Sequence, residues 1–178
     1  MLRLGDHTAR ERPRVLVIGI GNTYRGDDAA GLAVAEWLRT TAPPDVVVVR
    51  HEGEPISLLE EWDQVPVVYL VDAMASGAEP GNVCRFDAAD GPLTARFRPR
   101  GSHALGVADA IELGRALGRL PGRLVGYGIE GGCFATGATL SPPVREAVAV
   151  VSERLLAELD ADVPEARPAD FRSRDLGP

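Results

Sequence analysis

The chain has 178 residues, which is enough for one domain with a substantial core and too few for two. Apolar residues make up 45 % of it, the formal net charge is −7, and the isoelectric point is near 5. This acidic balance argues against nucleic acid or an anionic membrane as a partner, because both select basic surfaces. The sequence also shows neither a secretory signal nor an apolar run near the roughly 20 residues of a membrane span, so we expect a cytoplasmic protein.

The first half of the chain alternates strand patterns with helical patterns. Residues 15–20 are a continuous apolar run, typical of a strand buried on both faces, and residues 28–41 repeat apolar side chains at helical spacing. We predict a second strand at residues 46–50, a short helix at 55–62 and a third strand at 67–71. Strands separated by helices are typical of a parallel sheet.

The second half continues this alternation. We predict a short extra strand at residues 82–86, a helix at 102–117, a fourth main strand at 124–129 and a final helix at 140–159 that opens on two prolines. The fold class is therefore α/β: a single domain with a twisted, mostly parallel sheet of about five strands and helices on both faces.

Three segments follow from this pattern. We expect a flexible arm at residues 1–13, the α/β domain at residues 14–159 and a disordered, proline-containing tail at residues 160–178.

On the first helix we expect Trp37 to face the core together with Leu38. The two cysteines of the chain lie far apart, which argues against a disulfide framework and excludes a zinc site built on cysteine pairs.

Two adjacent aspartates, Asp27 and Asp28, stand where the first predicted helix begins. One carboxylate is enough to cap a helix, and we assign Asp27 to that role. The helix N-terminus favours an anion by about 0.3–1 kcal/mol, so Asp28 should be ionised and available to a metal ion. The glycines nearby are spaced G-x-G-x-x-x-x-G, with Tyr24 where a dinucleotide fingerprint has its third glycine, which ranks nucleotide binding below metal binding.

Two further residues at element ends are candidates for the same site. Asp72 ends the third predicted strand, and in a doubly wound sheet the first and third strands are commonly neighbours, so Asp72 would face Asp28. His103 follows Ser102 at the start of a helix, where the macrodipole favours the neutral, metal-binding imidazole. Two carboxylates and one imidazole suit a borderline metal ion.

Secondary candidates follow the second and fourth main strands. Glu130 would line the same crevice, and Cys133 is either a nucleophile activated by His103 or inert packing. His51 and its acidic neighbours are either a border of the cleft or a solvated surface. Asp27 remains a secondary site candidate, because its role and that of Asp28 could be exchanged.

Taken together, these motifs resemble the hydrogenase maturation endopeptidase family over about residues 14 to 158. The resemblance is carried, in the family's order and spacing, by these segments: Gly19-Ile20-Gly21-Asn22, Asp27-Asp28-Ala29-Ala30-Gly31, Val71-Asp72-Ala73, Ala78-Glu79-Pro80-Gly81-Asn82-Val83, Ser102-His103-Ala104-Leu105-Gly106, Gly128-Ile129-Glu130 and Leu140-Ser141-Pro142. One departure is Glu52-Gly53-Glu54-Pro55, where many relatives have an Asp-Gly-Gly-Thr type segment; this resembles a subgroup of the family.

The resemblance implies a peptidase that removes a short C-terminal extension from the large-subunit precursor of a nickel-iron hydrogenase. The family's metal-contacting positions map onto Asp28, Asp72 and His103, and the nickel they recognise is carried by the precursor, with no organic cofactor. Asp28 or Asp72 would also orient or deprotonate the attacking water. We expect a monomer whose partner is the precursor. Two alternatives are a cysteine peptidase using Cys133 and His103, and a non-enzymatic chaperone that binds nickel or a nucleotide.

Overall fold

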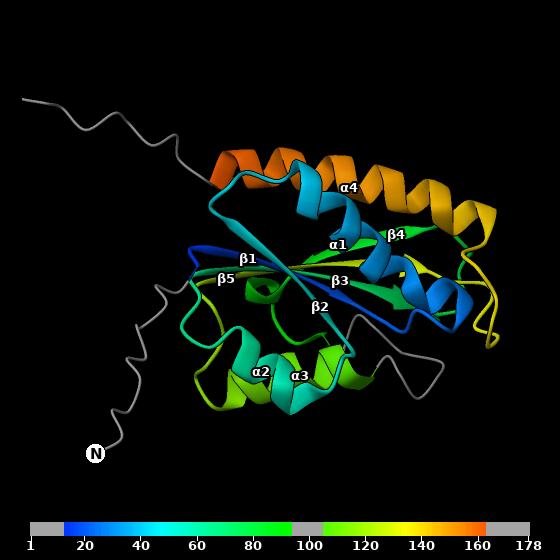
Figure 1. Cartoon of the computed structure of the whole chain (residues 1–178). Coiled ribbons are helices and arrows are strands. Elements are labelled where there is room, and N and C mark those ends of the chain that lie inside the picture. Colours follow the sequence, from blue (N-terminus) through cyan, green and yellow to red (C-terminus); the bar gives the residue numbers. More distant parts are fainter. Residues whose placement is uncertain (1–12, 94–104, 163–178) are drawn as a thin grey trace, which may run out of the picture.

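A five-stranded sheet organises the molecule. The computed structural model describes residues 13–93 and 105–162 of the chain. In these ranges the strand order is β2-β1-β3-β5-β4, with β1 at Val15–Ile20, β2 at Val46–His51, β3 at Val67–Met74 and β5 at Arg123–Glu130 all parallel (Figure 1). The edge strand β4, Val83–Asp87, pairs antiparallel with β5. The predicted α/β class and mostly parallel sheet are therefore confirmed.

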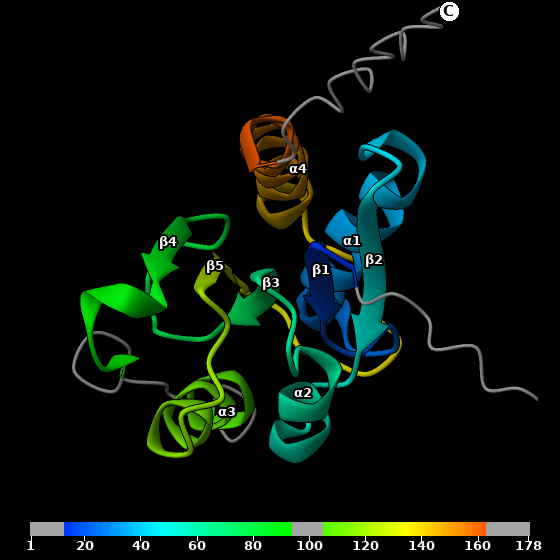
Figure 2. The ribbon, with the colours of Figure 1, turned by 90° about the vertical axis from the view of Figure 1, so that its left-hand side faces the viewer.

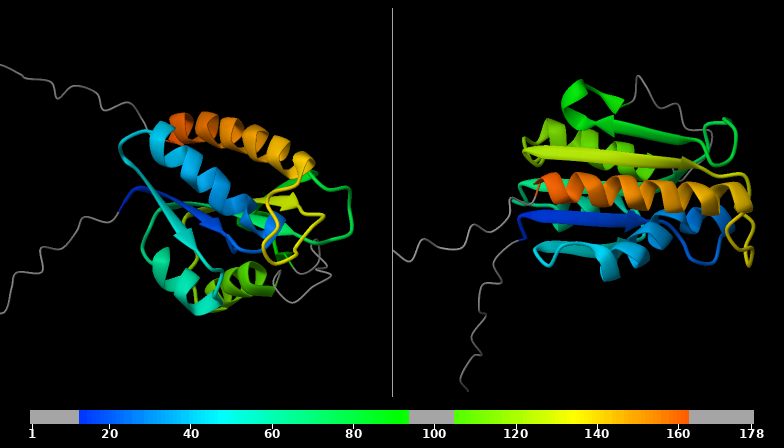
Figure 3. Two further views of the ribbon diagram at one scale, coloured as in Figure 1. Left: turned by 45° about the vertical axis from the view of Figure 1, so that its right-hand side comes forward. Right: turned by 90° about the horizontal axis from the view of Figure 1, so that it is seen from above.

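Helices cover both faces of this sheet. Helices α1, Ala30–Thr41, and α4, Pro142–Asp162, pack side by side on one face (Figure 3). Helices α2, Pro55–Glu61, and α3, whose described part is Leu105–Ala116, pack on the other (Figure 2). Short 3-10 turns precede α1 and follow β4, at Gly26–Ala29 and Ala88–Asp90. None of the described helices is long and apolar enough to cross a membrane.

The sheet divides the core into two apolar layers. Val15 and Val17 of β1 point toward α1 and α4, whereas Leu16, Ile18 and Ile20 point toward α2 and α3. This alternation follows from the two-residue period of a strand, and it explains why β1 is apolar at nearly every position. The second layer includes the buried side chains Leu58, Leu59 and Trp62, as the helical pattern of residues 55–62 predicts.

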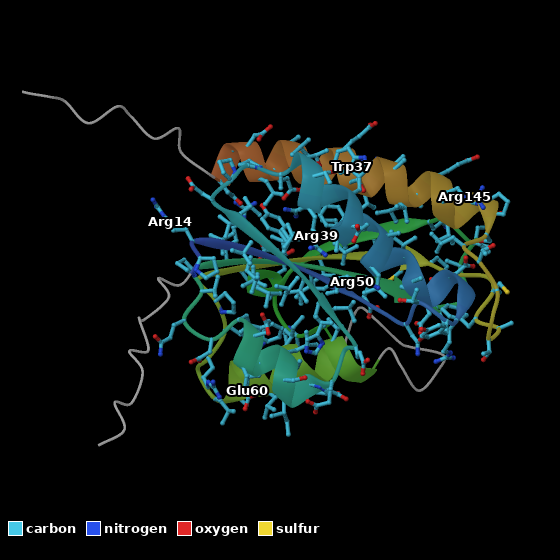
Figure 4. The ribbon with its side chains drawn as sticks, viewed as in Figure 1. Arg14, Trp37, Arg39, Arg50, Glu60 and Arg145 are labelled. Carbon is cyan, nitrogen blue, oxygen red and sulfur yellow. The ribbon has the colours of Figure 1, made fainter. Side chains whose placement is uncertain are left out.

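The prediction for Trp37 is wrong. Trp37, labelled in Figure 4, is 39 % exposed, while Val34, Ala35 and Leu38 are fully buried. The reason is the close approach of α1 to the sheet: a Cβ on Gly31 would lie only 2.1 Å from the carbonyl oxygen of Val71. Trp37 lies six residues from Gly31, about 120° around the helix from this contact, whereas Leu38 lies almost directly above it and is buried.

The observed helices and strands differ from the predicted ones mainly at their ends. The α1 pattern begins as a 3-10 turn and becomes α-helical only at Ala30. Strand β3 continues through Asp72 to Met74 because it pairs with β5 along its whole length. Helix α4 runs to Asp162, so residues 160–162, predicted to belong to the tail, are helical.

Candidate active site

Asp27 and Asp28 begin in the same turn but point to different places. The 3-10 turn has no side-chain cap, so the prediction that Asp27 caps the first helix is wrong. The carboxylate of Asp27 instead accepts hydrogen bonds from the backbone N–H groups of Gly132 and Cys133 at 2.8 Å and from the N–H and hydroxyl of Ser141 at 2.6 and 3.0 Å. Asp27 therefore anchors the loop between β5 and α4.

The protonation of Asp27 suits this structural role. Its side chain is fully buried, and burial by itself raises the pKa of a carboxyl group. The hydrogen bonds from Ser141, Gly132 and Cys133 outweigh that effect and hold the pKa of Asp27 below its ordinary value. An ionised carboxylate with this many donors is already satisfied and has little capacity left for a metal ion or a substrate.

Asp28 and Asp72 lie at the carboxyl ends of neighbouring strands. Strands β1 and β3 pair in parallel with Gly19 opposite Val71, so Asp72 follows directly at the edge where the turn carrying Asp28 leaves β1. The backbone of that turn closes on itself, since the N–H of Asn22 donates to the carbonyl of Asp28 at 3.2 Å. Asp28 and Asp72 both line one cleft. This agrees with the prediction that they face each other across the strand ends.

The two carboxylates influence each other electrostatically. Burial raises the pKa of Asp72 to about 7, and the negative charge of Asp28 adds to the shift, although the N–H of Ala73 donates to Asp72 Oδ1 at 2.8 Å and opposes it. Asp28 is 8 % exposed and has Arg25 Nη1 at 3.7 Å from its Oδ2. A carboxyl group that titrates near neutral pH in a cleft is typical of a site that handles protons or cations.

The cleft itself is large and acidic. It has a volume of about 960 Å³ and opens at the carboxyl edge of β1, β2 and β3, between the starts of α2 and α3. Arg50, near the end of β2, lines the cleft and donates a hydrogen bond to Thr23 Oγ1 at 2.9 Å. The carboxylates that line it come from several elements: Asp28, Glu52, Glu54, Asp72 and Asp109.

His103 lies outside the described residues. The described part of α3 begins two residues after it, and Gly106 and Val107 of that helix line the cleft. Among residues 13–93 and 105–162, no three His, Cys, Asp or Glu side chains gather closely enough to hold a metal ion. The three-residue metal contact of Asp28, Asp72 and His103 therefore stays a prediction.

Glu130 and Cys133, the two secondary candidates after β5, do not line this cleft. Glu130 is 1 % exposed, and its two carboxylate oxygens accept from Ser76 Oγ and the N–H of Gly77, both at 2.8 Å. It thereby anchors the turn after β3. Cys133 contributes its backbone N–H and carbonyl to the Asp27 anchor, and the residue is half-buried and forms no disulfide with the other described cysteine.

Sequence reasoning missed one polar arrangement in the cleft. His51 ends β2 and contacts Ser57 in the first turn of α2, with Nε2 and Oγ 3.0 Å apart. His51, Glu52 and Glu54 all line the cleft, and Glu52 and Glu54 are also exposed to solvent, so this segment is both a border of the cleft and a solvated surface. The six-residue spacing across a strand end and a helix start carries no periodic pattern, so only the tertiary structure reveals the pair.

Comparison with known proteins identifies the fold and the family. The family model described as hydrogenase maturation protease (HycI) matches residues 34–158. The chain is 32 % identical over 148 residues to the hydrogenase expression/formation protein HupD of Bradyrhizobium diazoefficiens, covering 80 % of this chain and 76 % of that protein. It is 28 % identical over 162 residues to the hydrogenase 2 maturation protease of Escherichia coli, covering 88 % and 97 %.

The chain belongs to the hydrogenase maturation protease family.

Solved structures agree with this assignment. The hydrogenase maturating endopeptidase HybD from Escherichia coli has the same fold, with a TM-score of 0.73 over 83 % of this chain and 93 % of that one at 24 % identity. The [NiFe] hydrogenase maturation protease HycI from Thermococcus kodakarensis has a TM-score of 0.63 and 27 % identity over 84 % and 94 %. This maturation protease is therefore an endopeptidase, as the sequence motifs predict.

Proposed function

We propose that this maturation protease removes the C-terminal extension of a nickel-iron hydrogenase large-subunit precursor after nickel insertion, and that Asp28, Asp72 and His103 contact the nickel. The family processes the C-terminus of that large subunit and is nickel-dependent. In this proposal nickel arrives with the precursor and is part of the substrate. The observation that carries it is the pair of carboxylates, Asp28 and Asp72, at adjacent strand ends in one cleft.

The electrostatics of the pair favour a cation. The charge of Asp28 and the burial of Asp72 together make the doubly ionised pair costly. A divalent ion between two carboxylates replaces their repulsion by attraction, so a nickel-loaded precursor gains affinity that a nickel-free precursor lacks. The cleft would thus distinguish a finished precursor from one that still awaits its metal.

Asp72 also suits the proton transfer of peptide hydrolysis. General bases work best when their pKa lies near the operating pH, and the pKa of Asp72 is about 7 in the metal-free protein, before nickel contacts it. Its Oδ1 accepts from the N–H of Ala73, which fixes the carboxylate and leaves Oδ2 to take a proton from the attacking water. In this assignment both carboxylates contact the nickel, and Asp72 additionally orients the attacking water.

The test is a cleavage assay followed by mass spectrometry, with nickel-loaded and nickel-free cognate precursor. We expect loss of the C-terminal peptide from the nickel-loaded form only. Asp28→Asn and Asp72→Asn should each lower the rate by about 100-fold or more, as expected for a lost metal contact or general base. Asp109→Asn is the matched control, since it removes the same charge from an exposed residue of the same cleft. Equal losses in all three variants would contradict the assignment.

The cysteine peptidase alternative has a simple test of its own. Cys133 does not line the cleft, so Cys133→Ala should leave cleavage of the nickel-loaded precursor unchanged. Complete loss of activity in a folded Cys133→Ala variant would favour the thiol instead. Membership of a protease family supports cleavage over the chaperone alternative.

A further inference from the structure

One polar cluster in the cleft has no part in the mechanism above. It consists of His51, Gly53, Glu54 and Ser57, which we call the His51 cluster. The N–H of Gly53 donates to His51 Nδ1 at 2.8 Å, and His51 Nε2 lies 3.0 Å from Ser57 Oγ. The carboxylate of Glu54 accepts from the N–H groups of Ile56 and Ser57 and so caps α2.

The hydrogen bonds fix the protonation of the imidazole ring. Because Nδ1 accepts from Gly53, the proton of the neutral ring is on Nε2 and is donated to Ser57 Oγ. The hydroxyl of Ser57 in turn donates to the carbonyl of Glu54 at 3.2 Å. A nucleophilic serine needs the opposite arrangement, with its hydroxyl donating to an unprotonated Nε2. The pair is therefore not a Ser-His catalytic pair.

The cluster instead supports the wall of the cleft. Gly106, near the start of α3, packs directly on the carbonyl of Gly53: a Cβ at Gly106 would lie 2.3 Å from that oxygen. The cluster thereby joins the end of β2, the start of α2 and the start of α3, and all three border the cleft that holds Asp28 and Asp72. The N–H of Gly53 that bonds His51 and the carbonyl that contacts Gly106 belong to adjacent peptide groups joined at the Gly53 Cα, so this residue links the imidazole ring to α3.

We propose that His51 is a positioning residue, whose neutral ring holds the Gly53 peptide against α3 and whose protonation releases that peptide and weakens cleavage. A protonated ring carries a hydrogen on Nδ1, which would face the N–H of Gly53, so the hydrogen bond becomes a repulsion. The cleavage readout rests on the proposed function, but the contact between His51, Gly53 and Gly106 stands without it.

The charged groups around His51 come from every neighbouring element. They are Arg50 on β2, Glu52 and Glu54 in the following turn, Glu61 at the end of α2, and Asp109 of α3 in the same cleft. Burial lowers the pKa of His51, whereas the charges of Glu61, Glu54 and Glu52 raise it, and burial prevails. The ring is therefore neutral at physiological pH and charges only in more acidic conditions.

Two substitutions separate this role from simple packing. Asparagine at position 51 can place an acceptor near the position of Nδ1, and it does not titrate; glutamine reaches toward Ser57 and leaves the N–H of Gly53 without its partner. We therefore expect His51→Asn to retain most of the kcat at neutral pH and to lose the His51-dependent fall at acid pH. His51→Gln should lower kcat by about tenfold at every pH, because Gly53 and the start of α3 would no longer hold the cleft wall in place.

The experiment has two arms. In the first, amide resonances of Gly53 and Gly106 are followed by NMR in the free protein between about pH 4.5 and about pH 8.5, a range that extends well below the ordinary histidine pKa because burial lowers the pKa of His51. We expect both resonances to titrate together in the native protein and not in His51→Asn. In the second, the ratio of kcat values of the native protein and His51→Asn is measured over the same range. Any effect of Asp72 is common to both proteins and cancels in this ratio.

Each outcome decides the proposal. Amide resonances that titrate identically in His51→Asn, or a kcat ratio independent of pH, would overturn it. So would a folded Ser57→Ala variant without activity, since that result would make Ser57 a nucleophile. If no variant cleaves any precursor, the proposed function fails, and the NMR arm alone still decides whether His51 positions the Gly53 peptide.

Discussion

At the residue scale, two neighbouring aspartates have opposite surroundings. Asp27 has four hydrogen bonds and no exposed surface, whereas Asp28 opens into the cleft. The difference comes from the 3-10 turn, in which successive side chains point about a third of a turn apart. One carboxylate therefore reaches the loop after β5, and the next reaches the end of β3.

This division predicts a stability loss in Asp27→Asn. The amide would face backbone N–H donors with its own N–H₂ group, so we expect the free energy of unfolding to fall by about 2–4 kcal/mol at neutral pH. Because the folded pKa of Asp27 lies below the unfolded value of 3.8, its contribution is present above that value and is lost as the pH falls. Urea unfolding at neutral and acidic pH measures both effects, with the exposed Asp45→Asn as control. A variant as stable as the control at neutral pH would contradict the anchor.

Asp72 leads to the opposite prediction. Its folded pKa of about 7 lies above 3.8, so the folded protein binds more protons than the unfolded chain between these values. Ionised Asp72 therefore costs stability as the pH rises, and metal-free Asp72→Asn should be more stable than the native protein by about 1–2 kcal/mol at pH 8, with no gain near pH 4. Asparagine can still accept from the N–H of Ala73. Thermal unfolding at the two pH values checks this. A variant less stable than the native protein at pH 8 would be evidence against a stability cost of ionised Asp72.

At the element scale, helix α4 is held to the sheet by ionic contacts as well as by its apolar side. Glu158 accepts two hydrogen bonds from Arg85 of β4, both at 2.9 Å, and a further one from the hydroxyl of Tyr127 on β5. Arg123 of β5 also approaches Glu158, at 3.5 Å. These contacts, which we call the Glu158 clamp, tie α4 to the antiparallel edge of the sheet.

Glu158→Gln should weaken this clamp. Arg85 is partly exposed, so we expect a loss of only about 1 kcal/mol in unfolding free energy at neutral pH. The hydrogen bonds from Arg85 lower the pKa of Glu158 despite partial burial, so the contribution is present above the ordinary value of 4.5 and disappears as the pH falls below it. Chemical denaturation compares the variant with Glu153→Gln, which removes a charge from the exposed face of the same helix. Equal effects of the two substitutions would show that the clamp contributes nothing.

At the scale of the whole molecule, periodicity predicts the elements and topology predicts where they meet. The apolar run of residues 15–20 and the helical repeat after it identify β1 and α1 without tertiary information, and the neighbouring of β1 and β3 follows from the fold class. The role of Asp27 could not be predicted, because its partner Gly132 lies 105 residues away and is recognised by its backbone. A backbone N–H group is present at every residue except proline, so a backbone partner cannot be recognised from residue types in the sequence. The His51 cluster could not be predicted for another reason, since the six-residue spacing of His51 and Ser57 matches no helical or strand period.

The extent of the folded unit gives the last prediction. Helix α4 continues to Asp162, whose carboxylate accepts from the hydroxyl of Tyr69 on β3 and from Arg123 on β5, and Leu159 is fully buried in the core. The sequence predicts a disordered tail at the C-terminus, so we expect a chain that stops after Asp162 to melt and cleave like the full chain. A chain that stops after Ala157 loses the Glu158 clamp and the Leu159 contacts, which should cost about 3–5 kcal/mol and lower the melting temperature by roughly 6–20 °C. Calorimetry of the two truncations makes the comparison. If the chain ending at Asp162 is destabilised to a similar degree, residues beyond it contribute to the fold, and the tail predicted for the C-terminus is structural.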